Sequence, residues 1–359
     1  MKHATFFLLP LAALLSLSGC QKEAIDPTNA QAGYTGYNGA GLLRNTASSI
    51  ILSNYQDLDQ KAAALAAAAA ALQNRPAAAT LEAARQAYRD ARGPWEATEA
   101  FAFGPVATQG LDAVIDTWPL NRVDLRNVLA SSAPITAASL SQLEGGLQGF
   151  HPVEYLLFGE DGSKALGSFT GQEYQFLTAA TQNLNTATSQ LLTYWQPTGG
   201  NFAAKLATAG PGNATYPSQK AALQELVNGL IGAADELGNS KMDRPLVLQS
   251  TDFEEAKYSR NSKAEFLQNL RGIENVYQGR YQQAGTGVGL AALVQQRNAA
   301  VDARFRQELT DAQTAVVAIP GTFGEAIFQN KAAVQAAQAK VRAVQSTLEN
   351  QIAPFINSL

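Results

Sequence analysis

One histidine carries whatever imidazole chemistry the mature chain can perform. The 359-residue sequence contains 2 His, and His3 lies in an N-terminal segment that we expect to be removed. The other, His151, stands three residues before Glu154 in the run Gly-Phe-His-Pro-Val-Glu at 149–154. An imidazole and a carboxylate at this spacing suit a pair of metal ligands or, beside the free N–H groups of a helix start, an anion site.

Pro152 lies between the two side chains and predicts their local geometry. Proline is favoured at the first helical position and pushes the preceding residue out of the helical region. The sequence therefore predicts that His151 is the N-cap and that Glu154 is the third helical residue. A capping box has the same spacing, so the spacing alone favours a structural role over metal binding.

Further carboxylates lie upstream of this motif. Pro94 resembles an early helix position, which would place Trp95 and Glu99 on one helical face. Asp112 and Asp116 are also four residues apart, just before Trp118-Pro119. Each pair alone is typical of solvated acids beside an aromatic core, although acids and aromatic residues together also form the walls of partly buried sites.

Helices must position these residues, because apolar side chains recur at three- and four-residue spacing and strand-like alternation is missing. We predict an all-α protein with two four-helix-bundle-like halves packed around a pocket. The helical segments are expected at about 61–72, 175–195, 219–237, 263–282, 288–317 and 330–357. The expected parts are a signal peptide (1–19), a flexible tether (20–40), an N-terminal half (41–196), a linker (197–218) and a C-terminal half (219–359).

The N-terminus predicts export and lipidation. An apolar run from Phe6 to Leu17 is too short to span a bilayer and ends in Leu-Ser-Gly-Cys, which resembles a lipobox with Cys20 as the acylated residue. An ordinary signal peptide is the alternative. Gln21 in place of an aspartate favours the outer membrane of the cell envelope, facing the periplasm or the surface. Cys20 is the single Cys of the chain, so the mature protein has no disulfide or thiolate metal site.

The charge balance excludes one class of partner. The net charge is −4, whereas a nucleic-acid groove needs a basic face. No later segment is predicted to span a membrane, so the membrane is a partner only through the lipid at Cys20.

Several blocks of the sequence resemble the imelysin family, whose hallmark is Gly-x-His-x-x-Glu. The run at 149–159 matches this hallmark, and the similarity extends in order over most of 40–357. Upstream blocks contain Trp95, Glu99 and the Asp112…Asp116-Thr117-Trp118-Pro119 stretch. The downstream block runs from Glu254 through Tyr258, Ser259 and Arg271 to Gly279.

The resemblance implies envelope proteins tied to iron uptake and regulation, some of which are named after an insulin-cleaving membrane protease. It implies a pocket between two helical halves, lined by His151 and Glu154 with Glu99, and further by Trp95, Asp112, Asp116, Tyr258, Ser259 and Arg271. The favoured function is binding of a divalent or trivalent metal, iron before zinc, or of a small iron-bearing ligand, in concert with envelope iron-transport proteins. His151, Glu154 and Glu99 are then the expected metal ligands, with Asp112 or Asp116 as further candidates. Tyr258, Ser259 or a backbone carbonyl could orient the imidazole.

Three alternatives stay open at this point. One is a metallopeptidase, although a His-Glu-x-x-His site is excluded because the mature chain lacks a second histidine. Another is haem binding through His151, which is the less favoured cofactor. The third is a scaffold lipoprotein whose pocket binds a peptide.

Overall fold

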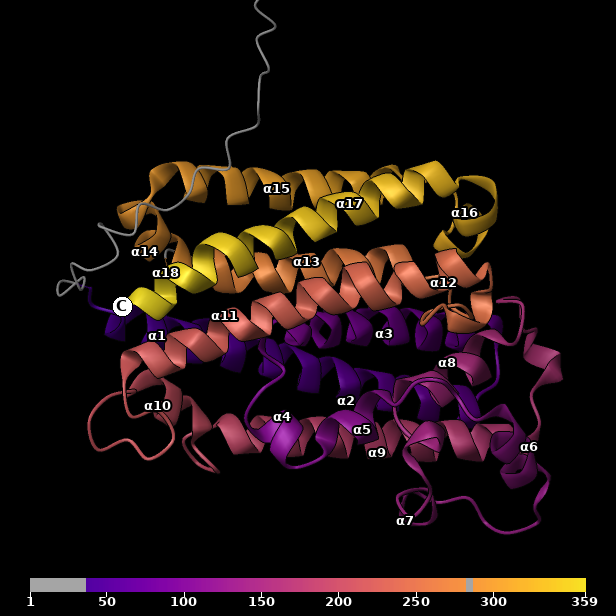
Figure 1. The fold of residues 1–359 in the computed structure, drawn as a ribbon. Helices are drawn as coiled ribbons and strands as arrows, with labels where there is room; N and C mark the ends of the chain where they lie inside the picture. Colours follow the sequence, from indigo (N-terminus) through magenta and orange to yellow (C-terminus); the bar gives the residue numbers. More distant parts are fainter. Residues whose placement is uncertain (1–36, 282–286) are drawn as a thin grey trace, which may run out of the picture.

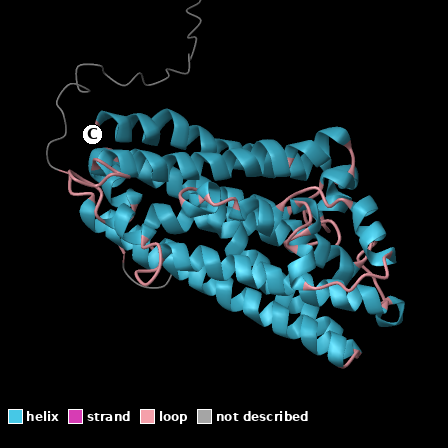
Figure 2. Cartoon of the chain, turned by 90° about the horizontal axis from the view of Figure 1, so that it is seen from below, coloured by secondary structure: helices cyan, strands magenta, loops and turns pink. Residues whose placement is uncertain are grey.

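The computed structural model describes residues 37–281 and 287–359, and these residues form helices joined by loops, without a β-strand (Figures 1 and 2). The predicted all-α class is therefore confirmed. The predicted signal peptide, the lipidation site at Cys20 and residues 20–36 of the predicted tether lie outside the described residues. Within the described ranges no helix is both long enough and apolar enough to cross a membrane.

Three long helices dominate the first part of the chain. Helix α2 (Ser53–Asn74) packs along both α3 (Ala78–Ala97) and α9 (Gly171–Trp195). Alanine is the best helix former, and its small side chain lets neighbouring helices approach closely, which explains the alanine-rich run in α2. Five short helices connect α3 to α9, namely α4 (Pro105–Thr108), α5 (Leu111–Asp116), α6 (Arg122–Ala130), α7 (Ala137–Leu140) and α8 (Phe150–Phe158).

Four long helices dominate the second part, namely α11 (Gln219–Asp235), α13 (Ser262–Gln278), α15 (Ala299–Ala318) and α17 (Lys331–Thr347). The segment predicted as one helix over 288–317 is two, because Asn298 interrupts it and its side chain caps α15. The shorter helices are α1 (Ala40–Asn45), α10 (Phe202–Ala207), α12 (Asp243–Leu248), α14 (Leu290–Arg297), α16 (Phe323–Gln329) and α18 (Ala353–Ser358). Helix α10 lies inside the stretch predicted as a linker.

The two parts meet along α13, which packs against α3 on one side and α15 on the other (Figure 1). A Cβ atom on Gly272 would lie 2.3 Å from the carbonyl oxygen of Ala97, so only glycine lets the backbones of α13 and α3 approach this closely. The end of α3 is thereby pressed against the C-terminal segments. The acids and bases of both parts meet at this contact.

Candidate functional site

The histidine motif starts its helix earlier than the sequence predicts. Helix α8 begins at Phe150, with Gly149 as its N-cap, so the prediction that His151 is the N-cap is wrong. Gly149 has φ 75° and ψ −151°, a conformation that is essentially restricted to glycine and turns the chain directly into the helix. Pro152 occupies the third helical position, where an amide N–H would have no helical partner in any case.

Gly149 also sets how closely α8 approaches α5. A Cβ atom at this position would lie 2.1 Å from the carbonyl oxygen of Ile115, which is closer than real contacts permit. Because Ile115 precedes Asp116, this approach brings the start of α8 against the end of α5. His151 and Asp116 become neighbours as a result.

His151 is buried, with 1% of its surface exposed. Its Nε2 atom lies 3.0 Å from Oδ1 of Asp116, and the ring of Trp118 packs against the imidazole with the ring centroids 4.6 Å apart. Neither ring nitrogen has a hydrogen-bond partner of normal geometry among the described residues. Burial disfavours the imidazolium, but Asp116 outweighs this effect and raises the pKa of His151 to about 9.

Glu154 lies on the other edge of the imidazole. Its Oε2 is 3.9 Å from Nδ1 of His151 and has no hydrogen-bond partner in the described part of the chain. Its Oε1 accepts hydrogen bonds from the backbone N–H of Ser259 at 2.7 Å and from the Ser259 hydroxyl at 2.6 Å. Tyr258 packs edge-on against Tyr155 of α8. The 258–259 segment therefore fixes Glu154, which faces Nδ1, while Asp116 faces Nε2.

The end of α3 contributes a buried arginine and its anions. Helix α3 continues through Pro94 to Ala97, so the prediction that Pro94 starts a helix is wrong. Glu99 instead lies in the 3-10 turn Thr98–Phe101. The fully buried guanidinium of Arg92 donates to four carboxylates, those of Glu96, Asp116 (2.7 Å), Glu255 (3.0 Å) and Glu265 (2.7 Å).

Asp116 is held in place by two further groups. The indole N–H of Trp95 donates to its Oδ2 at 2.5 Å, and Arg92 donates to its Oδ1. Burial alone would raise the pKa of Asp116, but Arg92 and His151 hold it well below its usual range. Asp116 is therefore ionised at every physiological pH.

Lys241 supplies the second cation of the cluster, from a π-helical turn after α11. Its ammonium lies 2.8 Å from Glu96, 3.0 Å from Glu255 and 3.5 Å from Glu99. The two cations Lys241 and Arg92 do not balance the negative charge of all the acids around them, and three of these acids have raised pKa values. Burial raises the pKa of Glu99 well above its usual value, raises that of Glu255, and raises that of Glu265 to about 7.

A cavity of about 160 Å³ opens onto this cluster from solvent. His151 lies behind its wall, next to Asp116 and Trp118. The lining carries five acids and two bases, which favours entry of cations. The lining residues are Glu99, Asp112, Asp116, Trp118, Glu236, Ser240, Lys241, Arg244, Phe253 and Glu255.

Two groups of side chains in the described residues have ligand atoms within 4.8 Å of one another. Glu96, Glu255 and Glu265 form the first group, but the guanidinium of Arg92 already occupies the space between them. Asp116, His151 and Glu255 form the second group. The second group is the better candidate for a metal ion, because it includes the buried imidazole and because Asp116 and Glu255 line the cavity, although Arg92 donates to both carboxylates.

The structure distributes the residues predicted for the site over several places. Asp116 and Glu154 lie beside His151 and are held by Trp95 and Ser259 respectively, whereas Glu99 and Asp112 lie along the cavity wall. Arg271 is elsewhere, on a face of α13 that lines a second cavity. Sequence reasoning missed Glu255, Lys241 and Arg92 with its partners Glu96 and Glu265. The one available signal was the four-residue spacing of Arg92 and Glu96, which places an ion pair on one helical face.

Comparisons with known proteins give a consistent result. The sequence model of a family described as Imelysin matches residues 51–351. Iron-regulated protein A of Synechococcus elongatus is 33% identical over 311 residues, covering 86% of this chain and 84% of that protein. A solved structure of a putative iron-regulated protein A precursor from Parabacteroides distasonis ATCC 8503 has a TM-score of 0.80 at 21% identity, covering 88% of this chain and 94% of that one. An imelysin-like protein from Psychrobacter arcticum 273-4 has a TM-score of 0.74 at 16% identity, covering 89% and 97%.

Proposed function

The chain belongs to the imelysin family, and from this premise we propose that it binds a metal ion, iron in preference to zinc, through His151, Asp116 and Glu255. The name of the relative from Synechococcus elongatus supports a link to iron. This proposal retains His151 and Asp116 from the ligand candidates in the sequence, adds Glu255, and assigns Glu154 and Glu99 supporting roles.

The buried imidazole of His151 is the observation that carries this proposal. Its Nε2 lies 3.0 Å from Asp116 and its Nδ1 lies 3.9 Å from Glu154, and neither contact has the geometry of a normal hydrogen bond. A single buried imidazole among carboxylates is a donor set that suits a metal ion. An ion placed between Nε2, Asp116 and Glu255 would use Nε2 and two carboxylates that already point at the same space.

The donor set fits the proposed ion. Carboxylate oxygens with one imidazole suit iron or manganese better than the thiolate-rich sites that favour other metals. Glu154 faces Nδ1 from 3.9 Å and would orient the imidazole, as carboxylates beside metal-bound histidines commonly do. Glu99 and Asp112 on the cavity wall would attract the ion toward its ligands.

Charge in the cluster also supports uptake of a cation. Five acids, Glu96, Glu99, Asp116, Glu255 and Glu265, surround only two permanent cations, Arg92 and Lys241. Burial raises the pKa values of three of these acids, and neighbouring carboxylates raise them further. A bound ion would stabilise their ionised forms, so its uptake would release protons.

The size of the cavity favours an ion over a larger ligand. Its volume of about 160 Å³ is below the roughly 300–1,000 Å³ typical of pockets for organic ligands. A haem or the peptide substrate of a metallopeptidase would need more room beside His151. Binding of an ion is therefore the function that the geometry supports best.

We further propose that the chain acts at the cell envelope, anchored at the outer membrane by acylation of Cys20, and delivers its ion to envelope transport proteins. The sequence around Cys20 supports this location. Membrane fractionation of the wild type and of Cys20→Ala tests it. The wild type should sediment with outer membranes, and the variant should be released; an unchanged distribution would contradict the anchoring role.

Metal content of the chain, purified without chelators, tests the metal site. We expect about one iron per chain after incubation with Fe²⁺, with little retained by His151→Gln or Glu255→Gln. Glu82→Gln is the matched control, because Glu82 is on α3, its side chain is 64% exposed, and it lies ten residues, or about 15 Å, from Arg92.

A pH indicator in weak buffer at pH 6.5 should record proton release as the ion binds. Wild-type iron content in both site variants would reject the ligand set. Circular dichroism of each variant separates loss of ligands from loss of fold.

A further inference from the structure

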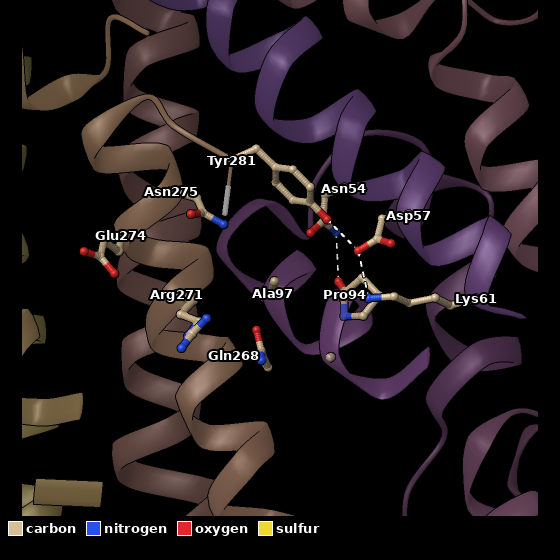
Figure 3. Close-up of a pocket in the computed structure, with 11 residues that line it drawn as sticks. Asn54, Asp57, Lys61, Pro94, Ala97, Gln268, Arg271, Glu274, Asn275 and Tyr281 are labelled. Atoms are coloured by element: carbon tan, nitrogen blue, oxygen red, sulfur yellow. Dashed lines mark hydrogen bonds and ion pairs between the residues drawn. The ribbon is translucent and has the colours of Figure 1, made fainter. Parts of the chain in front are cut away.

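We propose that a second cavity, on the opposite side of α3 from His151, binds a small organic acid through the guanidinium of Arg271. The cavity has a volume of about 360 Å³ and lies among α2, α3 and α13 (Figure 3). This volume falls within the roughly 300–1,000 Å³ of pockets that hold small organic ligands. The proposal is independent of the metal site.

Small residues of α3 create the space. Gly93, Pro94 and Ala97 line the cavity, and none of them has a side chain long enough to fill it. Arg92 and Glu96, on the other face of the same helix, point into the buried ionic cluster. The two sites therefore share α3 as a common wall but do not share lining residues.

Helix α13 presents three unused polar side chains to this space. Gln268, Arg271 and Asn275 are spaced three and four residues apart, so they lie on one face of the helix. Figure 3 shows all three directed toward the space between α13 and α3. Within the described ranges, 37–281 and 287–359, none of these side chains has a hydrogen-bond or ion-pair partner, although Asn275 is 92% buried.

The nearby acids are already engaged with other groups. Glu274 also lines the cavity, but its carboxylate accepts hydrogen bonds from the amides of Gln278 and Gln313, both at 2.9 Å (Figure 3). Asp57 on α2 accepts from Lys61 at 3.0 Å and from the hydroxyl of Tyr281 at 2.9 Å. Among residues 37–281 and 287–359, the guanidinium of Arg271 is therefore left without a carboxylate partner.

These groups define the chemistry of the ligand. A guanidinium binds a carboxylate through two parallel N–H···O bonds. The amides of Gln268 and Asn275 both donate and accept, which suits hydroxyl groups on the same ligand. One water occupies about 30 Å³, so the cavity of about 360 Å³ has room for many waters. A single small inorganic anion would therefore leave most of it unfilled. A hydroxycarboxylate is the class that fits.

Isothermal titration with L-malate and with lactate, on the chain freed of metal by a chelator, tests this proposal. We expect a dissociation constant of about 1 mM or lower for at least one of the two acids. Arg271→Gln should weaken binding about tenfold or more, because it removes the charge-assisted hydrogen bonds. Gln268→Leu, which keeps Arg271, should weaken it by a smaller factor.

Two controls locate the binding. Arg75→Gln removes an exposed arginine at the far end of α2, fourteen residues or about 21 Å from Lys61, and should bind malate like the wild type. His151→Gln alters the candidate metal site and should also leave malate binding unchanged.

Three results would overturn the proposal. The first is that neither acid binds better than inorganic phosphate or glycerol. The second is an unchanged affinity in Arg271→Gln. The third is loss of binding in His151→Gln with retention in Arg271→Gln, which would place the acid at the metal site.

Discussion

Replacement of Gly149 by alanine should both destabilise the fold and disrupt the histidine site. Gly149 has φ 75° and ψ −151°, and this region costs a residue with a side chain about 1–3 kcal/mol. The added Cβ atom would also lie 2.1 Å from the carbonyl oxygen of Ile115. An ordinary contact needs about 3.4 Å, so α8 and α5 must separate by roughly 1 Å, at a further cost in packing. We expect a total loss of about 3 kcal/mol or more.

The same displacement should weaken metal binding. The distance of 3.0 Å between Nε2 of His151 and Oδ1 of Asp116 depends on the close approach at Gly149. A shift of roughly 1 Å at the start of α8 would move the imidazole away from both carboxylate ligands. We expect the affinity for Fe²⁺ to fall about tenfold or more, as it does when groups that position metal ligands are changed.

Gly110 provides the matched control for this experiment. Its φ is also positive, at 66°, but a Cβ atom there would meet nothing within 4 Å. Gly110→Ala should therefore lose only about 1 kcal/mol, the cost of a left-handed residue, and should keep its metal affinity. Guanidinium denaturation gives the stabilities, and titration with Fe²⁺ gives the affinities. Equal stability losses in the two variants, or an unchanged affinity in Gly149→Ala, would refute the reasoning.

Three further predictions follow from buried charge and helix propensity. Burial raises the pKa of Glu254 to about 7, so the unfolded chain loses this proton from about pH 4.5, whereas the folded chain retains it until about pH 7. The free energy of unfolding therefore falls as the pH rises through this window. Glu254→Gln should make the chain about 2–4 kcal/mol more stable at pH 8 and leave its stability unchanged at pH 4. Arg92→Met should lower the free energy of unfolding by about 3–5 kcal/mol at pH 7, because four carboxylates lose their shared cation. Thermal unfolding should show a smaller loss of stability at pH 5, where some of these carboxylates are protonated. An equal loss at both pH values would contradict the electrostatic explanation. Gly232→Ala should add about 0.5–1 kcal/mol, because Gly232 lies within α11 and a Cβ atom there meets nothing within 4 Å; destabilisation in guanidinium would show that the helix needs glycine there.

The long helices could be predicted because their pattern is local. In the helical segment predicted over 330–357, apolar side chains at three- and four-residue spacing are buried, namely Val334, Ala337, Val341 and Val344 of α17 and Leu348 just after it, while Ala333 is half-buried. Helix boundaries depended on conformations that the sequence does not specify. Pro94 lies within α3 although proline usually interrupts a helix, and the preceding residue, Gly93, lacks the Cβ atom that would clash with the proline ring.

The candidate site could be predicted only in part, because it is assembled from distant segments. His151 and Glu154 belong to one motif, and in the structure the carboxylate of Glu154 faces Nδ1 of His151 at 3.9 Å. Glu255 precedes α13 in the chain, and the fold brings its carboxylate within 4.8 Å of the ligand atoms of His151 and Asp116. No spacing in the sequence distinguishes Glu255 from its neighbour Glu254, since the choice depends on tertiary packing. The buried cations Arg92 and Lys241 were missed for the same reason.

The arrangement of charges separates structural ion pairs from the groups that a ligand would use. Arg92 and Lys241 already satisfy Glu96, so this acid has a lowered pKa despite its burial. A cluster that served only the fold would neutralise all of its members in this way, because unpaired buried charge destabilises a protein. Here burial raises the pKa values of Glu99 and Glu255, which line the cavity, and of Glu265, and the carboxylate of Glu255 lies within 4.8 Å of the His151 imidazole. Under the proposed function, a cation entering through the cavity would neutralise these acids.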